Sequence, residues 1–289
     1  MFAHLGLKRI AAWVAGGIST LAILVGGSAP AVANDDHPYL ALGDSVVFGY
    51  ITKAGFEYAN PHNFVGYPDY VGQELRFNTT NASCPGEATA GFISATGADN
   101  GCRPFRAGAA LHVSYTGTQL DFATTFLKRH HDTRLVSIGL GANDAFLLES
   151  ACAHDPQCIA NGLPQLLATI SANMRTILDA LRATHFHGVL MIVNYYSLDY
   201  SDASATGLTQ LLNQAITSSA EADHAVVADA FDAFKAAANT QFAAGNTCRA
   251  GLLNASPQNQ FLCDVHPSQS GQQLLAHTVE NAYAVAAND

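Results

Sequence analysis

Short apolar runs rich in β-branched residues alternate along the chain with longer segments of helical period. Strands are predicted at 39–42, 77–82, 135–139, 189–194 and 225–228. Helices are predicted at 69–76, 119–130, 163–184, 208–222 and 269–286. The helix at 163–184 has the clearest pattern, because its leucines, isoleucines and methionine recur at three- and four-residue steps. This alternation is typical of a parallel sheet covered by helices, so we predict an α/β fold: a doubly wound, flavodoxin-like domain with a central, mainly parallel five-stranded sheet.

Three long segments show neither period and are interpreted as surface loops: 46–68, 84–117 and 239–265. Long loops on a rigid sheet are where binding and catalytic residues tend to lie. Residues 34–289 contain no Pro/Gly/Ser-rich linker, charge block or internal repeat, so a single domain is predicted for them.

The first 33 residues have the pattern of an export signal. Lys8 and Arg9 precede an apolar stretch at 10–27, and the small residues at 31–33 fit a cleavage site. A membrane anchor is the weaker interpretation, because glycine and hydroxyl side chains interrupt the apolar stretch. We therefore expect a secreted protein that keeps no membrane span after signal removal.

Composition and charge narrow the partners. The chain has 49% hydrophobic and 12% charged residues, which excludes a disordered protein. Its formal charge is −10, and removing the two basic residues of the signal makes it −12. Nucleic acid is not an expected partner, since phosphate binding needs clustered lysine and arginine. A small-molecule or lipid substrate without negative charge is favoured, and we expect a monomer.

Six cysteines follow the signal segment, and an even number in an oxidising compartment indicates three disulfides. Pairing neighbours along the chain closes loops without crossing the core. This gives Cys84–Cys102, Cys152–Cys158 and Cys248–Cys263 as the expected bridges, among the 15 pairings that six cysteines allow. Zinc is the alternative use of cysteine and histidine, but the chain has no CxxC pair and no HExxH motif, so no metal is expected.

Three candidate site residues follow the first three predicted strands, at the end where open α/β sheets bind their ligands. They are Ser45, Gly86 and Asn143. Near the end of the chain, His266 stands before a proline and a predicted helix, and an imidazole titrates in the range of a general base. A serine hydroxyl needs such a base to become a nucleophile.

Four segments carrying these residues resemble the SGNH, or GDSL, hydrolase family in order and spacing. They are LGDSVVFG (42–49), NASCPGEATAGF (81–92), GLGANDAF (139–146) and DVHPSQSG (264–271). The resemblance extends from near residue 38 to the end of the chain and includes secreted actinobacterial esterases and lipases. It implies a serine esterase or lipase of SGNH fold that works without metal or cofactor.

By this resemblance, Ser45 attacks an ester carbonyl, and His266 takes up its proton and later delivers it to the leaving alkoxide. The oxyanion hole would consist of the backbone N–H groups of Ser45 and Gly86 and the side-chain amide of Asn143. Glycine suits a close backbone approach, and an amide donates a hydrogen bond without adding charge. Asp44 and Asp144 are interpreted as structural, because short acids after strands commonly accept from loop amides.

One position departs from the family pattern. The family places its triad acid three residues before the histidine, where this chain has Cys263, and the nearest carboxylate is Asp264. In an extended segment Asp264 and His266 point to the same side, so Asp264 is the favoured orienting group. The alternative is a Ser–His dyad in which a backbone carbonyl near Cys263 or Gln260 fixes the imidazole.

Several functions remain open at this point. A phospholipase or a carbohydrate O-deacetylase would use the same residues, a secreted binding protein could retain the fold without activity, and a metal-dependent phosphoesterase could use Asp44, Asp264 and His266. Aromatic residues crowd segment 48–70 and favour acyl chains if they form a groove, although core packing is an equal alternative. The same two interpretations, a groove for acyl chains or core packing, apply to Tyr195, Tyr196 and Tyr200.

Overall fold

A parallel five-stranded sheet in the order β2-β1-β3-β4-β5 forms the centre of the fold. The computed structural model describes residues 37–53, 55–259 and 262–288. The strands are β1 (Pro38–Gly43), β2 (Asn78–Asn81), β3 (Leu135–Gly139), β4 (Val189–Val193) and β5 (Ala225–Ala228). The α/β architecture and the five strands predicted from the sequence are therefore confirmed.

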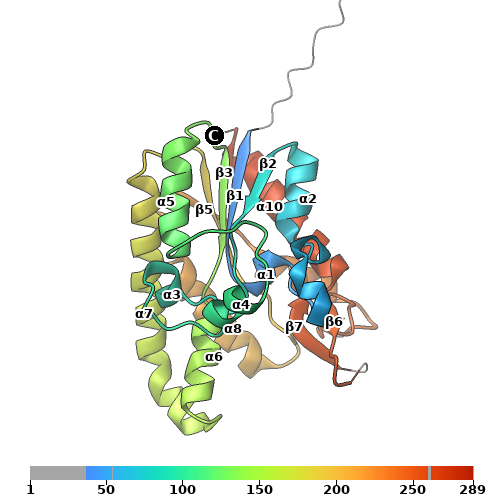
Figure 1. The fold of residues 1–289 in the computed structure, drawn as a ribbon. Coiled ribbons are helices and arrows are strands. Elements are labelled where there is room, and N and C mark those ends of the chain that lie inside the picture. The colour runs from blue at the N-terminus through green and yellow to red at the C-terminus, as the bar shows by residue number, and fades with distance from the viewer. Residues whose placement is uncertain (1–36, 54, 260–261, 289) are drawn as a thin grey trace, which may run out of the picture. The chain divides into compact units, whose positions relative to one another are not determined.

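Helices cover both faces of this sheet (Figure 1). One face packs against α3 (Thr89–Ile93), α5 (Gln119–Arg129), α7 (Pro156–Arg182) and α8 (Ala203–Thr217). The other face packs against α2 (Tyr67–Leu75), α9 (Ala230–Ala238) and α10 (Gln269–Ala286). Side chains alternate along β1, so that Leu40 and Leu42 enter the first core while Tyr39 and Ala41 enter the second. A strand buried on both faces has to be apolar throughout, which is why its sequence reads as a continuous run.

The segments predicted as loops contain short elements, which corrects that prediction. They are α1 (Ser45–Phe48), the 3₁₀ helices η1 (Gly55–Ala59) and η2 (Pro61–Asn63), α3, α4 (Cys102–Gly108), and the antiparallel strands β6 (Leu253–Ala255) and β7 (Cys263–Pro267). Elements of three to seven residues are too short to show a period in sequence.

Helix boundaries differ from the prediction where a helix is exposed. Helix α7 begins at Pro156, not at residue 163, and it runs through Pro164. Its first turns are mostly exposed and carry no apolar stripe, while Asp155 caps them by accepting from the N–H of Cys158 at 2.7 Å. Helix α8 likewise follows an aspartate cap, Asp202, and begins at Ala203, five residues before the predicted start at 208. The described residues also form helix α9, named above, and helix α6 (Ala142–Ala151).

Disulfides join the predicted pairs, Cys84–Cys102, Cys152–Cys158 and Cys248–Cys263. Within the described ranges, none of the helices has both the length and the hydropathy needed to cross a membrane. The predicted export signal at 1–33 lies outside the described residues.

The strand order reverses between β1 and β3, because the chain leaves β1 for β2 on one side and returns to β3 on the other. Such a switch point opens a crevice at the carboxyl ends of the two strands. Gly43 and Gly139, the last residues of β1 and β3, are paired in register. The residues that follow them, including Ser45 and Asn143, are therefore brought close together.

Candidate active site

Ser45 is the first residue of the one-turn helix α1, immediately beyond β1. The turn is tight because Gly43 has φ +140°, and a Cβ at this position would lie 2.0 Å from the carbonyl oxygen of Gly139. Asp44 caps α1 by accepting from the N–H of Val46 at 2.9 Å. Ser45 is half-exposed at this end of the sheet.

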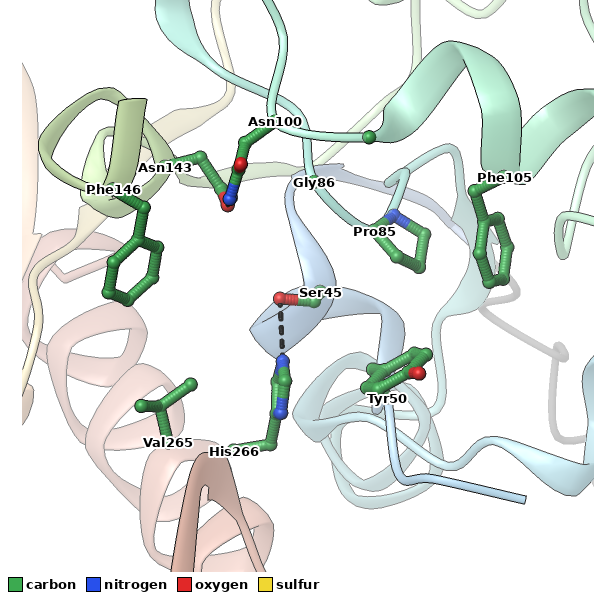
Figure 2. A pocket seen from close by; sticks show the side chains of 11 residues that line it. Ser45, Tyr50, Pro85, Gly86, Asn100, Phe105, Asn143, Phe146, Val265 and His266 are labelled. Carbon is green, nitrogen blue, oxygen red and sulfur yellow. Dashed lines mark hydrogen bonds between the residues drawn. The ribbon is translucent and has the colours of Figure 1, made fainter. Parts of the chain in front are cut away.

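His266 reaches Ser45 from strand β7, which is 221 residues further along the chain. Its Nε2 lies 3.0 Å from Ser45 Oγ, within hydrogen-bond distance (Figure 2). The preceding residue is held in place because the carbonyl oxygen of Val265 accepts from the hydroxyl of Tyr196 at 2.6 Å. The ring of Tyr50 packs against the imidazole with 4.8 Å between centroids. The imidazole is therefore held on the hydroxyl by contacts from two separate elements.

Asp264 lies beside the other imidazole nitrogen without a hydrogen bond to it. Its Oδ1 is 3.4 Å from His266 Nδ1, and the same oxygen accepts from the backbone N–H of His266 at 2.7 Å. Nδ1 is buried and has no hydrogen-bond partner among the described residues. The Asp264 carboxylate can act on the imidazole through its charge, but the geometry of a hydrogen-bonded triad is not formed. Of the alternative carbonyls, that of Gln260 lies outside the described residues.

The turn that contains Gly86 lies on the side of Ser45 opposite His266 (Figure 2). Gly86 has φ +85°, and a Cβ there would lie 2.5 Å from the carbonyl oxygen of Asn100, so only glycine fits this turn. Within the described part of the chain, the N–H groups of Ser45 and Gly86 donate to no acceptor. Two unpaired donors near one hydroxyl are what a developing oxyanion requires.

Asn143 lies beside these donors, but its amide is partly engaged. Its Nδ2 donates to the carbonyl oxygen of Glu87 at 3.0 Å and, over a longer 3.4 Å, to Asp44 Oδ2. Its Oδ1 accepts from Asn100 Nδ2 at 3.0 Å. The amide is thus held rigidly, and the hydrogen on the long contact is the one that a substrate oxyanion can compete for.

Asp44 and Asp144 both form structural hydrogen bonds. Burial raises the pKa of Asp44 to about 6, although hydrogen bonds from the Tyr195 hydroxyl and the Val46 N–H and the charge of His266 oppose this shift. Asp144 joins helix α6 to α3, since its carboxylate accepts from the N–H of Thr89 at 3.0 Å and from its hydroxyl at 2.6 Å. Burial likewise raises the pKa of Asp144. Through these hydrogen bonds, both carboxylates connect the segments that carry Ser45 and Asn143 to neighbouring parts of the fold.

Sequence reasoning missed a buried pair that supports the site. The amide of Gln119 bonds both backbone groups of Gly43, accepting from its N–H at 3.0 Å and donating to its carbonyl oxygen at 2.8 Å. Gln119 also donates to Glu87 Oε2 at 3.1 Å. Burial raises the pKa of Glu87 to about 7, more than the Gln119 hydrogen bond lowers it. The pair links the strand that leads to Ser45 with the turn that contains Gly86, and no local pattern marks either residue.

The tyrosines after β4 do not form an acyl groove. Tyr195 donates to Asp44 Oδ2 at 2.5 Å, and Tyr200 donates to the carbonyl oxygen of Phe231 at 2.7 Å. Tyr196 packs its ring on Phe234 with 4.3 Å between centroids. The aromatic residues of segment 48–70 divide between core packing and a groove. Phe48 and Phe64 are buried in a core cluster, whereas Tyr50 lines a pocket.

The pocket has a volume of about 350 Å³ and is lined by Ser45, His266, Gly86 and Asn143 together with apolar side chains (Figure 2). The structure thus brings four of the five predicted site residues to one cavity, with Asp264 behind the imidazole. The one cluster with metal-ligand spacing among the described residues is Cys84, Glu87 and Cys102, and the disulfide occupies both of its sulfurs.

Comparisons with known proteins agree with this architecture. The model of the GDSL-like lipase/acylhydrolase family matches residues 41–274, so the chain belongs to that family. No curated protein matched the sequence.

Three solved structures illustrate the shared fold. An acetyl xylan esterase variant from Geobacillus stearothermophilus is 15% identical with a TM-score of 0.53, covering 86% of this chain and 94% of its own. Phospholipase A1 from Streptomyces albidoflavus is 15% identical with a TM-score of 0.54, covering 86% of this chain and 99% of its own. The lipase Lip_vut3 from a goat rumen metagenome is 15% identical with a TM-score of 0.52, covering 85% of this chain and 97% of its own. At these identities the likeness concerns the fold alone.

Proposed function

We propose that the protein is a secreted serine hydrolase of carboxylic esters, with Ser45 as the nucleophile and His266 as the base. The distance of 3.0 Å between His266 Nε2 and Ser45 Oγ carries this proposal. Two residues far apart in sequence meet there at the edge of a pocket, and the N–H groups of Ser45 and Gly86, which also line it, donate to no acceptor among the described residues. Family membership supports hydrolysis, and three disulfides are compatible with an oxidising compartment.

The reaction would take place in two steps. Ser45 Oγ forms a bond to the ester carbonyl carbon while its proton passes to His266 Nε2. The carbonyl oxygen becomes an oxyanion that accepts from the N–H groups of Ser45 and Gly86, joined by the Asn143 amide. The carbon–oxygen bond to the alcohol then breaks, and His266 returns the proton to the alkoxide. Water, deprotonated by His266, hydrolyses the acyl-enzyme in the same way.

Labelling with a fluorophosphonate combined with p-nitrophenyl acetate hydrolysis tests this proposal. Replacing Ser45→Ala should abolish both labelling and turnover with an unchanged unfolding midpoint. Ser114→Ala, a change at an exposed serine outside the pocket, serves as the matched control and should behave as wild type. Turnover retained in Ser45→Ala would refute the assigned nucleophile. A folded wild-type protein that is neither labelled nor active would instead support a binding protein.

A further inference from the structure

Two apolar walls flank the line between Ser45 and His266 on opposite sides (Figure 2). The first, called here the Phe105 wall, consists of Tyr50, Pro85 and Phe105. The second, the Phe146 wall, consists of Phe146 and Val265. An ester bound with its carbonyl at Ser45 has two substituents, the acyl chain and the alcohol. The pocket offers an apolar surface to each.

The Phe105 wall is rigidly backed. The ring of Phe105 lies edge-on to Phe48 at 5.5 Å and to Tyr58 at 6.1 Å between centroids. The disulfide Cys84–Cys102 connects the turn that contains Pro85 with the first residue of α4, the helix that supplies Phe105. The disulfide therefore links the segment that carries Pro85 covalently to the helix that carries Phe105.

The Phe146 wall comes from different elements, so it can be changed independently. Phe146 lies on α6 and Val265 on β7, and the carbonyl oxygen of Val265 is anchored by Tyr196. None of the contacts that back Phe105 involves these two residues. A substitution in one wall can therefore be compared with a substitution in the other.

The polar side chains that line the pocket are already paired with one another or with neighbours. Asn100 donates to Asn143, and the hydroxyls of Tyr50 and Tyr58 lie 3.1 Å apart. Among the residues lining the pocket in the described part of the chain, none is an aspartate, glutamate, lysine or arginine. Sugar hydroxyls would thus find few free partners, and an unpaired polar group costs binding free energy.

Basic residues nearby are engaged elsewhere, which disfavours an anionic substrate. Arg103, on α4, donates to the carbonyl oxygens of Ala95 and Gly97. Arg106, on the same helix, donates to the carbonyl oxygens of Tyr115 and Gly117. Among the described residues, the lining of the pocket includes no lysine or arginine, and the net charge of the chain is −10, so a phosphate headgroup would find no ammonium or guanidinium group there.

Resting on the ester hydrolase function proposed above, we propose that the pocket selects neutral alkyl esters that are apolar on both sides of the carbonyl. One substituent contacts the Phe105 wall and the other contacts the Phe146 wall. A volume of about 350 Å³ is near the small end of ligand pockets, which suits chains of a few carbons on each side. Phe105 and Phe146 are then the specificity-determining residues, one for the acid and one for the alcohol.

Two series of esters distinguish the substituent that contacts each wall. One series varies the acid in methyl esters from acetate to octanoate, and the other varies the alcohol in acetates from methyl to octyl. Hydrolysis is followed by titrating the released acid. We expect kcat/KM to rise along both series by up to about fourfold per buried methylene until the pocket is filled. Phosphatidylcholine and acetylated xylooligosaccharide should be poorer substrates than the best alkyl ester.

Matched substitutions then assign each wall. Phe105→Ala should flatten the chain-length dependence in one series and leave the other within about twofold, and Phe146→Ala should do the reverse. Phe105→Leu and Phe146→Leu keep most of the side-chain volume and test the same point if an alanine variant unfolds. Phe242→Ala, at a side chain that is 81% exposed, is the control and should change neither series.

Several results would overturn the inference while leaving the ester hydrolase function intact. These are a flat dependence in either wild-type series, both substitutions acting on the same series, or a phospholipid or acetylated sugar as the best substrate. Failure of the proposed function itself is distinguishable. In that case no ester of either series is hydrolysed faster by the wild type than by Ser45→Ala.

Discussion

At the scale of single residues, the imidazole of His266 is held in an unusual way. Its Nε2 has a partner in Ser45, but its buried Nδ1 has none among the described residues, and the nearest carboxylate oxygen lies 3.4 Å away. If Nε2 accepts from the hydroxyl, the proton of the neutral ring is on Nδ1. In the proposed mechanism, Asp264 would then stabilise this proton, and the imidazolium formed during the reaction, by charge more than by a hydrogen bond.

Asp264→Asn tests whether Asp264 acts by its charge or by a hydrogen bond. Asparagine keeps an oxygen for the His266 N–H but carries no charge. We expect kcat to fall about 10- to 100-fold, less than the ~10,000-fold loss for a hydrogen-bonded triad acid. The measurement is kcat across pH with a p-nitrophenyl ester, and Asp132→Asn at an exposed site is the control. A loss near 10,000-fold would mean that a full triad forms during turnover. An unchanged kcat would assign the orienting role to another group.

Glu87 is a second residue whose environment has a measurable consequence. It is 3% exposed, and burial raises its pKa from 4.5 to about 7. The native state therefore holds the proton more tightly than the unfolded chain does. The resulting stabilisation is complete below pH 4.5 and is lost as the pH rises to about 7. Its size is on the order of 3 kcal/mol.

Glu87→Gln removes this titration while keeping an acceptor for Gln119. We expect the variant to unfold at higher urea concentration than the wild type at pH 8, with the difference shrinking as the pH falls to 4.5. Urea titrations at several pH values measure it, with Glu74→Gln at an exposed site as the control. A difference that stays constant with pH would show that Glu87 does not titrate in this range.

At the scale of elements, His266, the proposed base, lies on a marginally stable structure. Strands β6 and β7 form a two-stranded sheet, and such hairpins are barely stable alone. The disulfide Cys248–Cys263 closes a loop of 15 residues and ends at the first residue of β7. We therefore expect this bridge to help hold His266 against Ser45.

Removing this bridge by Cys248→Ser with Cys263→Ser should lower both kcat and stability, the latter by ~3 kcal/mol. The control is Cys152→Ser with Cys158→Ser, which opens a 6-residue loop between α6 and α7. This control should cost ~2 kcal/mol with kcat nearly unchanged. Urea unfolding and p-nitrophenyl ester turnover of the same preparations provide the comparison. Equal losses of kcat in the two variants would argue against a role for the hairpin bridge.

At the scale of the whole molecule, the five-stranded sheet and the β6–β7 hairpin together bring residues separated by up to 221 positions to one cavity. The remaining expectation at this scale concerns export. Protein recovered from the culture medium of a secreting host should begin at Asn34, and N-terminal sequencing or intact mass measures this. A secreted product that retains residues 1–33 would show that the segment is not a cleaved signal.

Much of this arrangement could be predicted from the sequence because the signals are local. The strand runs and the helix at 163–184 have their period within one window, and Ser45, Gly86, Asn143 and His266 each lie in a short contiguous motif. Buried parallel strands are apolar over their whole length, so their positions are visible without knowing their neighbours.

Only the tertiary structure showed what holds these motifs together. Gln119 reaches Gly43 across 76 residues, and Tyr195 reaches Asp44 across 151, so neither bond leaves a periodic trace. The relation of Asp264 to the imidazole depends on a side-chain rotation, and the two pocket walls depend on elements distant in sequence that meet in the fold. The sequence determines which backbone segments are strands and helices because those hydrogen bonds and burial patterns repeat locally, whereas buried polar contacts are decided by which side chains the packed sheet happens to bring together.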